Sequence, residues 1–330
     1  MSHLDLRSLD GQRLFITGGT GFFGLWLLSA LRVLNGQAIS VDVCVLSRDP
    51  AGFLSYHPQF RDQSWLSFIS GNVRDFQIPD GQFDFLLHAA TETSKSAHAN
   101  PTQMFDDIVL GTSHVLDLAE RSGVRRMLLI SSGAVYGPQP TGLTHLPDEF
   151  QMACNPLLPA SSYGEGKRVM ELMGAMLQHS TGIESITARC FAFCGPGLPL
   201  NGHFAIGNFV RDALFGDQIT VEGDGSPMRS YLYGADLAVW LLHLLLNGKA
   251  GESYNVGSDE ALSIKDLALR VRDVLAPEKS VKVLQEGGTE PQLRQRYVPS
   301  ISRARALGCK PWSSLDESIF FSGDFWRASY

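Results

Sequence analysis

The chain has 330 residues, of which 44% are hydrophobic and 18% are charged, and its formal net charge is −7. This length suits one large α/β domain or two unequal lobes, and the composition excludes an intrinsically disordered chain. The acidic balance, without any block of lysine or arginine, argues against nucleic acid as a partner. It still leaves room for single arginines that bind phosphate.

The cysteines, the longest apolar run and the N-terminus indicate a soluble protein. Five scattered cysteines lack the spacing of a zinc site, which predicts reduced thiols and no bound metal. The apolar run at 237–246 is too short to span a bilayer and contains His243, so we expect a buried helix there. The N-terminus lacks the long apolar segment of a secretory signal. We therefore expect a cytoplasmic protein without a membrane partner.

Predicted strands and helices alternate along the first part of the chain. The candidate strands are apolar runs, several of them continuous as in strands covered on both faces, at 13–18, 41–47, 65–71, 83–90, 126–132 and 184–191. Helical patterns lie between them, among them 24–34, 104–123 and 163–178. This alternation predicts an α/β fold of the Rossmann type, with a doubly wound parallel sheet.

After Phe191 the pattern changes. A break rich in glycine and proline precedes a helical pattern at 206–215 and a short strand pattern at 219–222. The stretch 228–257 resembles a return to the main sheet. We therefore predict a dinucleotide-binding domain made of 1–191 and 228–257. A smaller, interleaved C-terminal lobe made of 192–227 and 258–330 would bind the substrate.

A glycine cluster, "ITGGTGFFG", follows the first predicted strand and opens the first predicted helix. Gly18, Gly21 and Gly24 are spaced three residues apart, which is a weak signal by itself, and a plain turn is the alternative. The position between strand and helix favours a phosphate cradle, because glycines let backbone N–H groups approach a pyrophosphate at the helix N-terminus.

Two further marks point to proton and hydride transfer. Tyr163 and Lys167 are four residues apart, on one face of a predicted helix. Ser131 and Ser132 end an apolar strand, where open α/β sheets place their ligands. A tyrosine of pKa about 10 is no base at neutral pH, but a neighbouring ammonium favours its phenolate. Such a phenolate can accept a hydroxyl proton while hydride leaves the same carbon, and a serine hydroxyl can stabilise the developing charge.

Together with "HAAT", "ARCFAFCGPG", "GDGSPMRSYLYGADLA", "YNVGS" and "RYVPSISRARALGCKP", these motifs resemble those of the extended short-chain dehydrogenase/reductase family, in its nucleotide-sugar epimerase/dehydratase branch. The resemblance covers nearly the whole chain. It implies NAD or NADP as cofactor, a nucleotide-diphosphate sugar as substrate and a homodimer, with the methionine-rich helix at 163–178 at the dimer contact.

The resemblance also implies roles for single residues. Ser132, Tyr163 and Lys167 would be catalytic. The cofactor would contact Gly18, Thr20, Gly21, Phe22, Phe23, Gly24, Arg48, Asn72, Val73, Ala89, Ala90, Tyr163 and Lys167. The substrate would contact Ser132, Asn208, Arg229 and Arg296. The fork of an arginine suits a diphosphate, although a surface ion pair is the alternative for Arg229.

The chain departs from the family pattern around both the cofactor and the substrate. Arg48 follows the second strand in place of an acidic residue, so NADP is plausible, and a solvated loop arginine is the alternative. Asn72 stands where the family usually has aspartate. Ile108 and Ala192 replace two asparagines, the second of which usually lies near the sugar diphosphate.

The positions after Ser132 bear on the reaction. The 4,6-dehydratases of this branch have Asp-Glu there and the related decarboxylases keep the Glu, whereas this chain has Gly133 and Ala134. Elimination needs a positioned acid and base. We therefore expect hydride transfer at C4 by an NDP-hexose 4-epimerase. The alternative is an NADPH-dependent 4-ketoreductase acting on an NDP-4-keto-6-deoxyhexose. A dehydratase or decarboxylase, which "YGEGKR" resembles, and a non-catalytic cofactor-binding protein rank lower.

Overall fold

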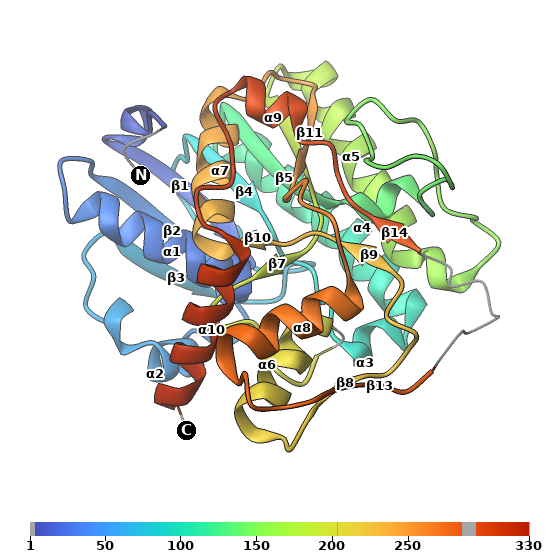
Figure 1. The fold of residues 1–330 in the computed structure, drawn as a ribbon. Helices are drawn as coiled ribbons and strands as arrows, with labels where there is room; N and C mark the ends of the chain where they lie inside the picture. The colour runs from blue at the N-terminus through green and yellow to red at the C-terminus, as the bar shows by residue number, and fades with distance from the viewer. Residues whose placement is uncertain (1–3, 203, 286–294, 330) are drawn as a thin grey trace.

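The computed structural model describes residues 4–202, 204–285 and 295–329. The described residues form a central sheet of seven strands in the order β11-β6-β5-β4-β1-β2-β3, with every neighbouring pair parallel (Figure 1). These strands are β1 (Gln12–Thr17), β2 (Val41–Ser47), β3 (Leu66–Ser70), β4 (Phe85–His88), β5 (Arg126–Ser132), β6 (Glu184–Cys190) and β11 (Ser253–Val256). The strand order reverses between β1 and β4, which opens a crevice at their carboxyl ends. The predicted doubly wound α/β fold is confirmed.

Helices cover both faces of this sheet. Helices α1 (Phe22–Asn35) and α7 (Gly234–Asn247) pack on one face, and α4 (Pro101–Arg121) and α5 (Ser162–Thr181) pack on the other. In β1, Leu14 and Ile16 join the core under α1 and α7, whereas Phe15 joins the core under α4 and α5. Burial on both faces is why the strands read as continuous apolar runs.

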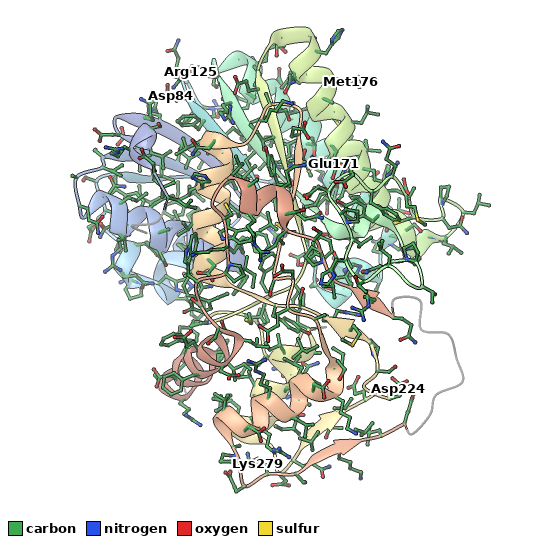
Figure 2. All side chains as sticks on the ribbon, turned by 45° about the horizontal axis from the view of Figure 1, so that its top comes forward. Asp84, Arg125, Glu171, Met176, Asp224 and Lys279 are labelled. Carbon is green, nitrogen blue, oxygen red and sulfur yellow. The ribbon has the colours of Figure 1, made fainter. Side chains whose placement is uncertain are left out.

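The second half of the chain also builds a smaller group of elements, most of which lie below the sheet in Figure 1, whereas its short helix at Ser302–Ala306 lies at the top of the view, beside β11. Its elements are β7 (Phe193–Cys194), α6 (Ala205–Phe215), β8 (Ile219–Val221), β9 (Met228–Arg229), β10 (Leu232–Tyr233), β12 (Leu262–Ser263), α8 (Ile264–Leu275), β13 (Val281–Val283), β14 (Arg296–Tyr297), α9 (Ser302–Ala306) and α10 (Leu315–Ser329). Lys279, labelled in Figure 2, donates to the carbonyl oxygens of Ala213 and Gly216 (2.7 Å each) and so closes the end of α6. Strand β11 returns the chain to the main sheet, while the domain boundaries themselves stay a prediction.

Short helices complete the fold: α2 (Pro50–Tyr56), α3 (Lys95–His98) and the 3-10 turns at Arg7–Leu9, Pro58–Phe60, Gly133–Tyr136 and Pro159–Ser161. The apolar run at 237–246 lies within α7, which is buried along most of its length. Among the residues that the structure describes, no helix is long and apolar enough to cross a membrane. All five cysteines are described, and each is a buried free thiol.

His88, at the end of β4, is buried and held in one neutral form. The Thr112 hydroxyl donates to the carbonyl oxygen of Ile108 (2.6 Å), so it accepts from Nε2 of His88 (3.2 Å). The Nδ1 of His88 then accepts from the Thr17 hydroxyl (2.7 Å). Burial lowers the pKa of His88 to about 3.

This neutral histidine predicts a loss of stability in mild acid. Below pH 6.5, the ordinary pKa of histidine, His88 binds a proton in the unfolded chain. In the folded protein it stays neutral until the pH falls to about 3. The free energy of unfolding therefore falls as the pH falls, by about 1.4 kcal/mol per pH unit from this residue. Urea unfolding between pH 7 and about pH 5 measures the slope. His88→Gln should flatten it, whereas His179→Gln, at an exposed position, should leave it unchanged.

Candidate active site

The glycine loop joins β1 to α1 and fits a pyrophosphate. Gly18 has φ +72°, and a Cβ there would lie 2.6 Å from the carbonyl carbon of Ala89. A Cβ at Gly24 would lie 2.1 Å from the backbone of Gly19, so the first turn of α1 packs directly against the loop. Gly21 is different, because the nearest atom to its Cβ is the Gly18 oxygen at 3.6 Å. The helix N-terminus is thus left open at Gly21, as an anion requires.

Two alanine variants separate these roles. Gly24→Ala should lower the free energy of unfolding by about 1–3 kcal/mol, because the new methyl group overlaps backbone. Gly21→Ala should keep normal stability, since its φ of −87° suits alanine, but weaken NAD(P) binding by about tenfold. Urea unfolding and cofactor titration measure the two effects. Equal affinity of Gly21→Ala and the wild type would remove the loop from the cofactor site.

Lys167 is the buried cation of the site. Its Nζ donates to the carbonyl oxygen of Ile130 (2.6 Å) and to the Thr91 hydroxyl (2.8 Å), and its side chain is almost fully buried. Burial lowers the pKa of Lys167 to about 8, against the opposing effects of Cys190 and Glu171. Lys167 is therefore still an ammonium at neutral pH, one turn of α5 after the half-buried Tyr163.

Residues after β4 join this site without having been predicted. Thr91 accepts from Lys167, and the exposed His98 places its ring edge-to-face with Tyr163, with centroids 5.8 Å apart. Both belong to the segment that follows "HAA", which the sequence analysis used only as a motif. Of the predicted pair Ala89 and Ala90, both backbone N–H groups donate to the Thr17 hydroxyl, which shapes the chain beside the glycine loop.

Ser132 ends β5 at the same edge of the sheet. Its Oγ accepts from the backbone N–H of Ala134 (3.1 Å) and lies 3.4 Å from the hydroxyl of Tyr297. Tyr297 comes from β14, far along the chain, and the sequence analysis did not propose it. The structure thus brings one predicted catalytic hydroxyl, Ser132, into contact with an unpredicted one.

No titratable side chain follows Ser132, and packing explains why. A Cβ at Gly133 would lie 2.6–2.8 Å from ring atoms of Phe191. Ala134 is buried, and its carbonyl oxygen accepts from the Cys154 thiol (3.1 Å). Position 133 therefore has no room for a side chain, and position 134 carries only a buried methyl group, so neither residue supplies the acid or base that an elimination needs.

A mostly buried ion pair supports the strand that carries Ser132. Arg189 of β6 makes a two-pronged contact with Glu171 of α5, from Nε to Oε1 (3.0 Å) and from Nη2 to Oε2 (2.7 Å). Glu171 also accepts from the Ser131 hydroxyl, next to Ser132. Figure 2 labels Glu171 well inside the molecule and Met176 further along α5. Arg189 donates in addition to the Tyr136 hydroxyl (3.0 Å).

The predicted adenosine side of the cofactor site lies at the ends of β2 and β3. Arg48 forms an ion pair with Glu92 (3.2 Å), and both side chains are largely exposed. Asn72 is half-buried and its Oδ1 accepts from the backbone of Arg74 (3.1 Å). Val73 packs against Gly111 of α4. The remaining predicted contacts, Thr20, Phe22 and Phe23, lie in the glycine loop and the first turn of α1.

The predicted substrate arginines lie on a small sheet of the second half of the chain. In the parallel pairing of β14 with β9, Tyr297 lies beside Arg229, and Arg296 lies beside Met228. Since side chains alternate along a strand, Arg229 shares a face with Tyr297 and Arg296 belongs to the other face. Arg296 donates to the carbonyl oxygen of Thr144 (3.3 Å), and Arg229 to that of Met228 (2.8 Å). The two guanidinium groups therefore do not share one face.

Asn208, the remaining predicted substrate contact, is a half-buried residue of α6. With its amide nitrogen facing the carbonyl oxygens of Leu200 and Gly202 (3.0 and 3.3 Å), it ties the preceding loop to the helix.

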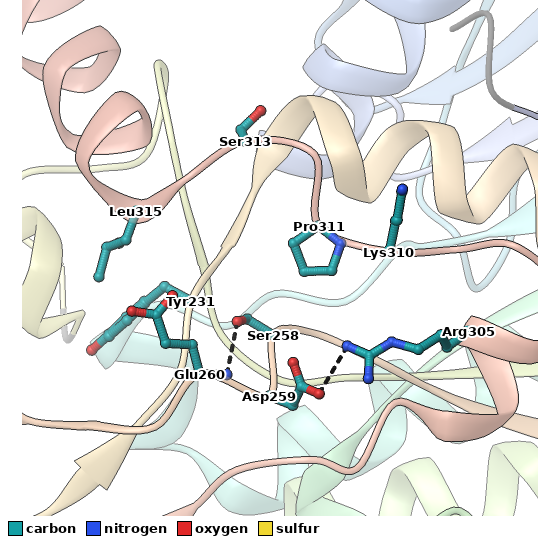
Figure 3. Close-up of a pocket in the computed structure, with 9 residues that line it drawn as sticks. All are labelled: Tyr231, Ser258, Asp259, Glu260, Arg305, Lys310, Pro311, Ser313 and Leu315. Atoms are coloured by element: carbon teal, nitrogen blue, oxygen red, sulfur yellow. Dashed lines mark hydrogen bonds and ion pairs between the residues drawn. The ribbon is translucent and has the colours of Figure 1, made fainter.

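A separate pocket of about 290 Å³ lies beyond β11 (Figure 3). Three of its four charged residues form ion pairs, Arg305 with Asp259 (3.0 Å) and Glu260 with Arg270 (2.9 Å), and the fourth is Lys310. None of the predicted catalytic residues lines it. We assign no ligand to this pocket, and the site stays at the carboxyl edge of β1, β4 and β5.

A family model described as "NAD dependent epimerase/dehydratase family" matches residues 14–257. UDP-glucuronic acid decarboxylase 6 of Arabidopsis thaliana is 30% identical, over 94% of this chain and 87% of its own length. UDP-glucuronic acid decarboxylase 1 of Xenopus tropicalis is 28% identical, over 95% of this chain and 72% of its own.

Solved structures agree on the fold. The UDP-glucose 4-epimerase of Thermotoga maritima superposes with a TM-score of 0.78 at 20% identity, over 96% of this chain and 99% of its own. RMD from Pseudomonas aeruginosa, complexed with NADPH, gives 0.77 at 23% identity, over 97% and 100%. The family model confirms both the resemblance seen in the sequence and the nicotinamide cofactor. The sequence analysis expected a 4-epimerase, whereas these two curated relatives are named as decarboxylases.

Proposed function

From the premise that the chain belongs to the NAD-dependent epimerase/dehydratase family and is an NAD(P)-dependent enzyme, we propose that its first chemical step is hydride removal from C4 of a nucleotide-diphosphate sugar. The supporting observation is the buried ammonium of Lys167, one helical turn from Tyr163 and bonded to the strand that ends in Ser132. The ammonium favours the Tyr163 phenolate, which accepts the proton of the C4 hydroxyl. Ser132 donates to the same oxygen, and the bound nicotinamide supplies the hydride acceptor.

Decarboxylation of a UDP-hexuronic acid is the overall reaction we place first. The two named relatives support it, because they cover nearly the whole chain at 28–30% identity. Oxidation at C4 makes the sugar carboxylate a β-keto acid, which loses CO2 with the ketone as electron acceptor. The C5–C6 bond breaks, C5 takes up a proton, and hydride returns to C4. Bond cleavage itself needs no acid or base at positions 133 and 134.

Epimerisation at C4 is the second candidate, and Ala134 favours it. Decarboxylases of this branch resemble one another in keeping a glutamate at this position, whereas here the side chain is a buried methyl group. A 4-epimerase, like a 4-ketoreductase, needs only the tyrosine, the lysine, the serine and the nicotinamide. Dehydration is disfavoured because it requires both a base at C5 and an acid at C6.

The nature of the cofactor and the assembly are proposals as well. Arg48 is exposed at the end of β2, where it forms an ion pair with the exposed Glu92. An exposed guanidinium at this position is available for a 2′-phosphate, which supports NADP. The outer surface of α4 and α5 exposes Leu110, Leu172 and Met176, each more than half accessible. This apolar surface is where we place the homodimer contact, and a monomeric mass by light scattering would contradict it.

One set of assays decides among these reactions. The purified protein is denatured and the released dinucleotide is identified by mass. The native enzyme is then given UDP-glucuronic acid, UDP-galactose, UDP-glucose and, together with NADPH, an NDP-4-keto-6-deoxyhexose. A UDP-pentose with CO2 identifies a decarboxylase, and interconversion of the two neutral sugars an epimerase. Turnover only of a 4-keto sugar with NADPH identifies a ketoreductase. Failure of every sugar to change the nicotinamide spectrum would overturn hydride transfer at C4.

A further inference from the structure

The space beside Gly133 is filled by the ring of Phe191, which packs against the ring of Tyr297, and the hydroxyl of Tyr297 reaches Ser132. Phe191 occupies the position where a side chain at residue 133 would project, within 2.6–2.8 Å of the Cβ it would have. The ring of Tyr297 lies on Phe191, with centroids 4.6 Å apart and planes inclined by 33°. The absence of a side chain at Gly133 makes room for Phe191, and Phe191 in turn packs against the phenol of Tyr297.

The backbone holds this phenol firmly. Residue Val298, next to Tyr297, is fully buried, and its N–H is bonded to the side chain of Gln139 (3.1 Å). Its carbonyl oxygen accepts from the backbone of Leu146 (2.9 Å). The half-buried Tyr297 thus reaches Ser132 from an anchored segment and not from a loose loop.

Two oxygen atoms near the catalytic edge lie within hydrogen-bond distance of the Tyr297 phenol. The Tyr297 oxygen lies 3.4 Å from Ser132 Oγ and 3.4 Å from the carbonyl oxygen of Cys190. Its one proton can serve only one of these two acceptors at a time. When it serves Cys190, the phenol oxygen can accept from Ser132, and the serine proton then points away from a substrate. When it serves Ser132, the serine proton has to point elsewhere.

The second arrangement is the one that a sugar requires. Ser132 Oγ has two lone pairs, of which the N–H of Ala134 takes one. If Tyr297 donates to the other, both lone pairs of Ser132 Oγ are occupied, and its proton is left to be donated to a bound sugar. Donation into Ser132 also strengthens the hydrogen bond that Ser132 gives, because bonds in a chain polarise one another.

We propose that Tyr297 is a positioning residue that turns the Ser132 hydroxyl toward the C4 oxygen of the sugar, in place of any polar group at positions 133 and 134. This inference rests on the proposed function, since it assumes that Ser132 donates to that oxygen. It holds for the decarboxylase and the epimerase alike, because both begin with the same transfer at C4. It also joins the catalytic edge of the main sheet to β14, whose other residue is Arg296.

The first test is Tyr297→Phe, which keeps the ring on Phe191 and removes only the hydroxyl. The rate of nicotinamide reduction by the active UDP-sugar should fall about tenfold, while the KM for that sugar and the affinity for NAD(P) change less than about twofold. Tyr254→Phe is the matched control. It removes a hydroxyl that accepts from the backbone of Lys249 (2.8 Å) far from Ser132, and should leave the rate unchanged. An unchanged rate in Tyr297→Phe overturns the inference.

The second test asks whether Tyr297 acts through Ser132. Ser132→Ala should slow reduction about 100-fold, and adding Tyr297→Phe should slow it by less than about twofold more. A further tenfold loss in the double variant would mean that the two residues act independently, and would overturn the positioning role. If Ser132→Ala alone keeps the wild-type rate, the proposed function fails before the inference does.

Discussion

Replacing Tyr163 by phenylalanine should lower the rate of hydride transfer about 10³-fold while leaving NAD(P) bound. The phenol is the only group in our mechanism that accepts the C4 hydroxyl proton, and a positioned acid or base contributes about 10²–10⁴-fold. The variant keeps the ring that packs against His98, so the fold should be preserved. Rapid mixing of enzyme and sugar, followed through the absorbance of the reduced nicotinamide, measures the rate.

The pH dependence of the same rate tests the role of Lys167. Its pKa of about 8 means that the ammonium is present at neutral pH and lost as the pH rises. Since the charge favours the phenolate, the rate should decline above about pH 8. Tyr56→Phe, a change at an exposed tyrosine, is the control and should follow the wild type throughout.

For the Tyr163→Phe prediction, the contradicting outcome is a variant that keeps the wild-type rate. Such a result would require a different acceptor for the C4 hydroxyl proton.

The sheet could be predicted from the sequence because its signal is local. Predicted strands at 41–47 and 126–132 coincide with β2 and β5, since runs buried on both faces need no knowledge of their partners. The glycine loop could be predicted for the same reason, because the strand, the loop and the helix follow one another directly in the sequence. Gly18 and Gly24 prove to be needed for close packing, and only Gly21 is left open for a ligand.

The contacts that complete the site could not be predicted, because they join segments that lie far apart in the sequence. Tyr297 meets Ser132 across 165 residues of sequence, a contact that depends on how β14 pairs with β9. Ile108 shows the same limit in another way. In the sequence Ile108 was noted only because the family usually has an asparagine there. In the structure it packs against Gly166, a residue of α5 that lies between Tyr163 and Lys167 in the sequence. Its apolar character is a requirement of the helix pair.

The ranking of the candidate reactions depends on the relatives as well as on the residues that follow Ser132. Gly133 and Ala134 indicated chemistry restricted to C4, and the packing of Phe191 on Gly133 accounts for their small size. The named relatives nevertheless support a decarboxylase over a 4-epimerase. The two observations are compatible, because a β-keto acid loses CO2 without a base. An acid to protonate C5 would have to come from elsewhere in the site.

Removing the charge of Glu171 should be the most destabilising single change near the site. Its partner Arg189 is mostly buried and forms two hydrogen bonds with the carboxylate. Breaking a buried pair leaves an uncompensated charge, which costs about 3–5 kcal/mol. Glu171→Leu should therefore lower the free energy of unfolding by that amount in urea titrations. Asp117→Asn, which breaks the exposed pair with Arg121, should cost no more than about 0.5 kcal/mol.

A second readout distinguishes the charge of Glu171 from its packing. Glu171 raises the pKa of Lys167 against the effect of burial, so its loss should lower that pKa further. In Glu171→Gln, which keeps the size of the side chain, the decline of the hydride-transfer rate should begin at a lower pH than in the wild type. Ser131 would lose the carboxylate it donates to, so the maximal rate should also fall. If the pH at which the rate declines does not change, the pKa of Lys167 does not depend on the charge of Glu171.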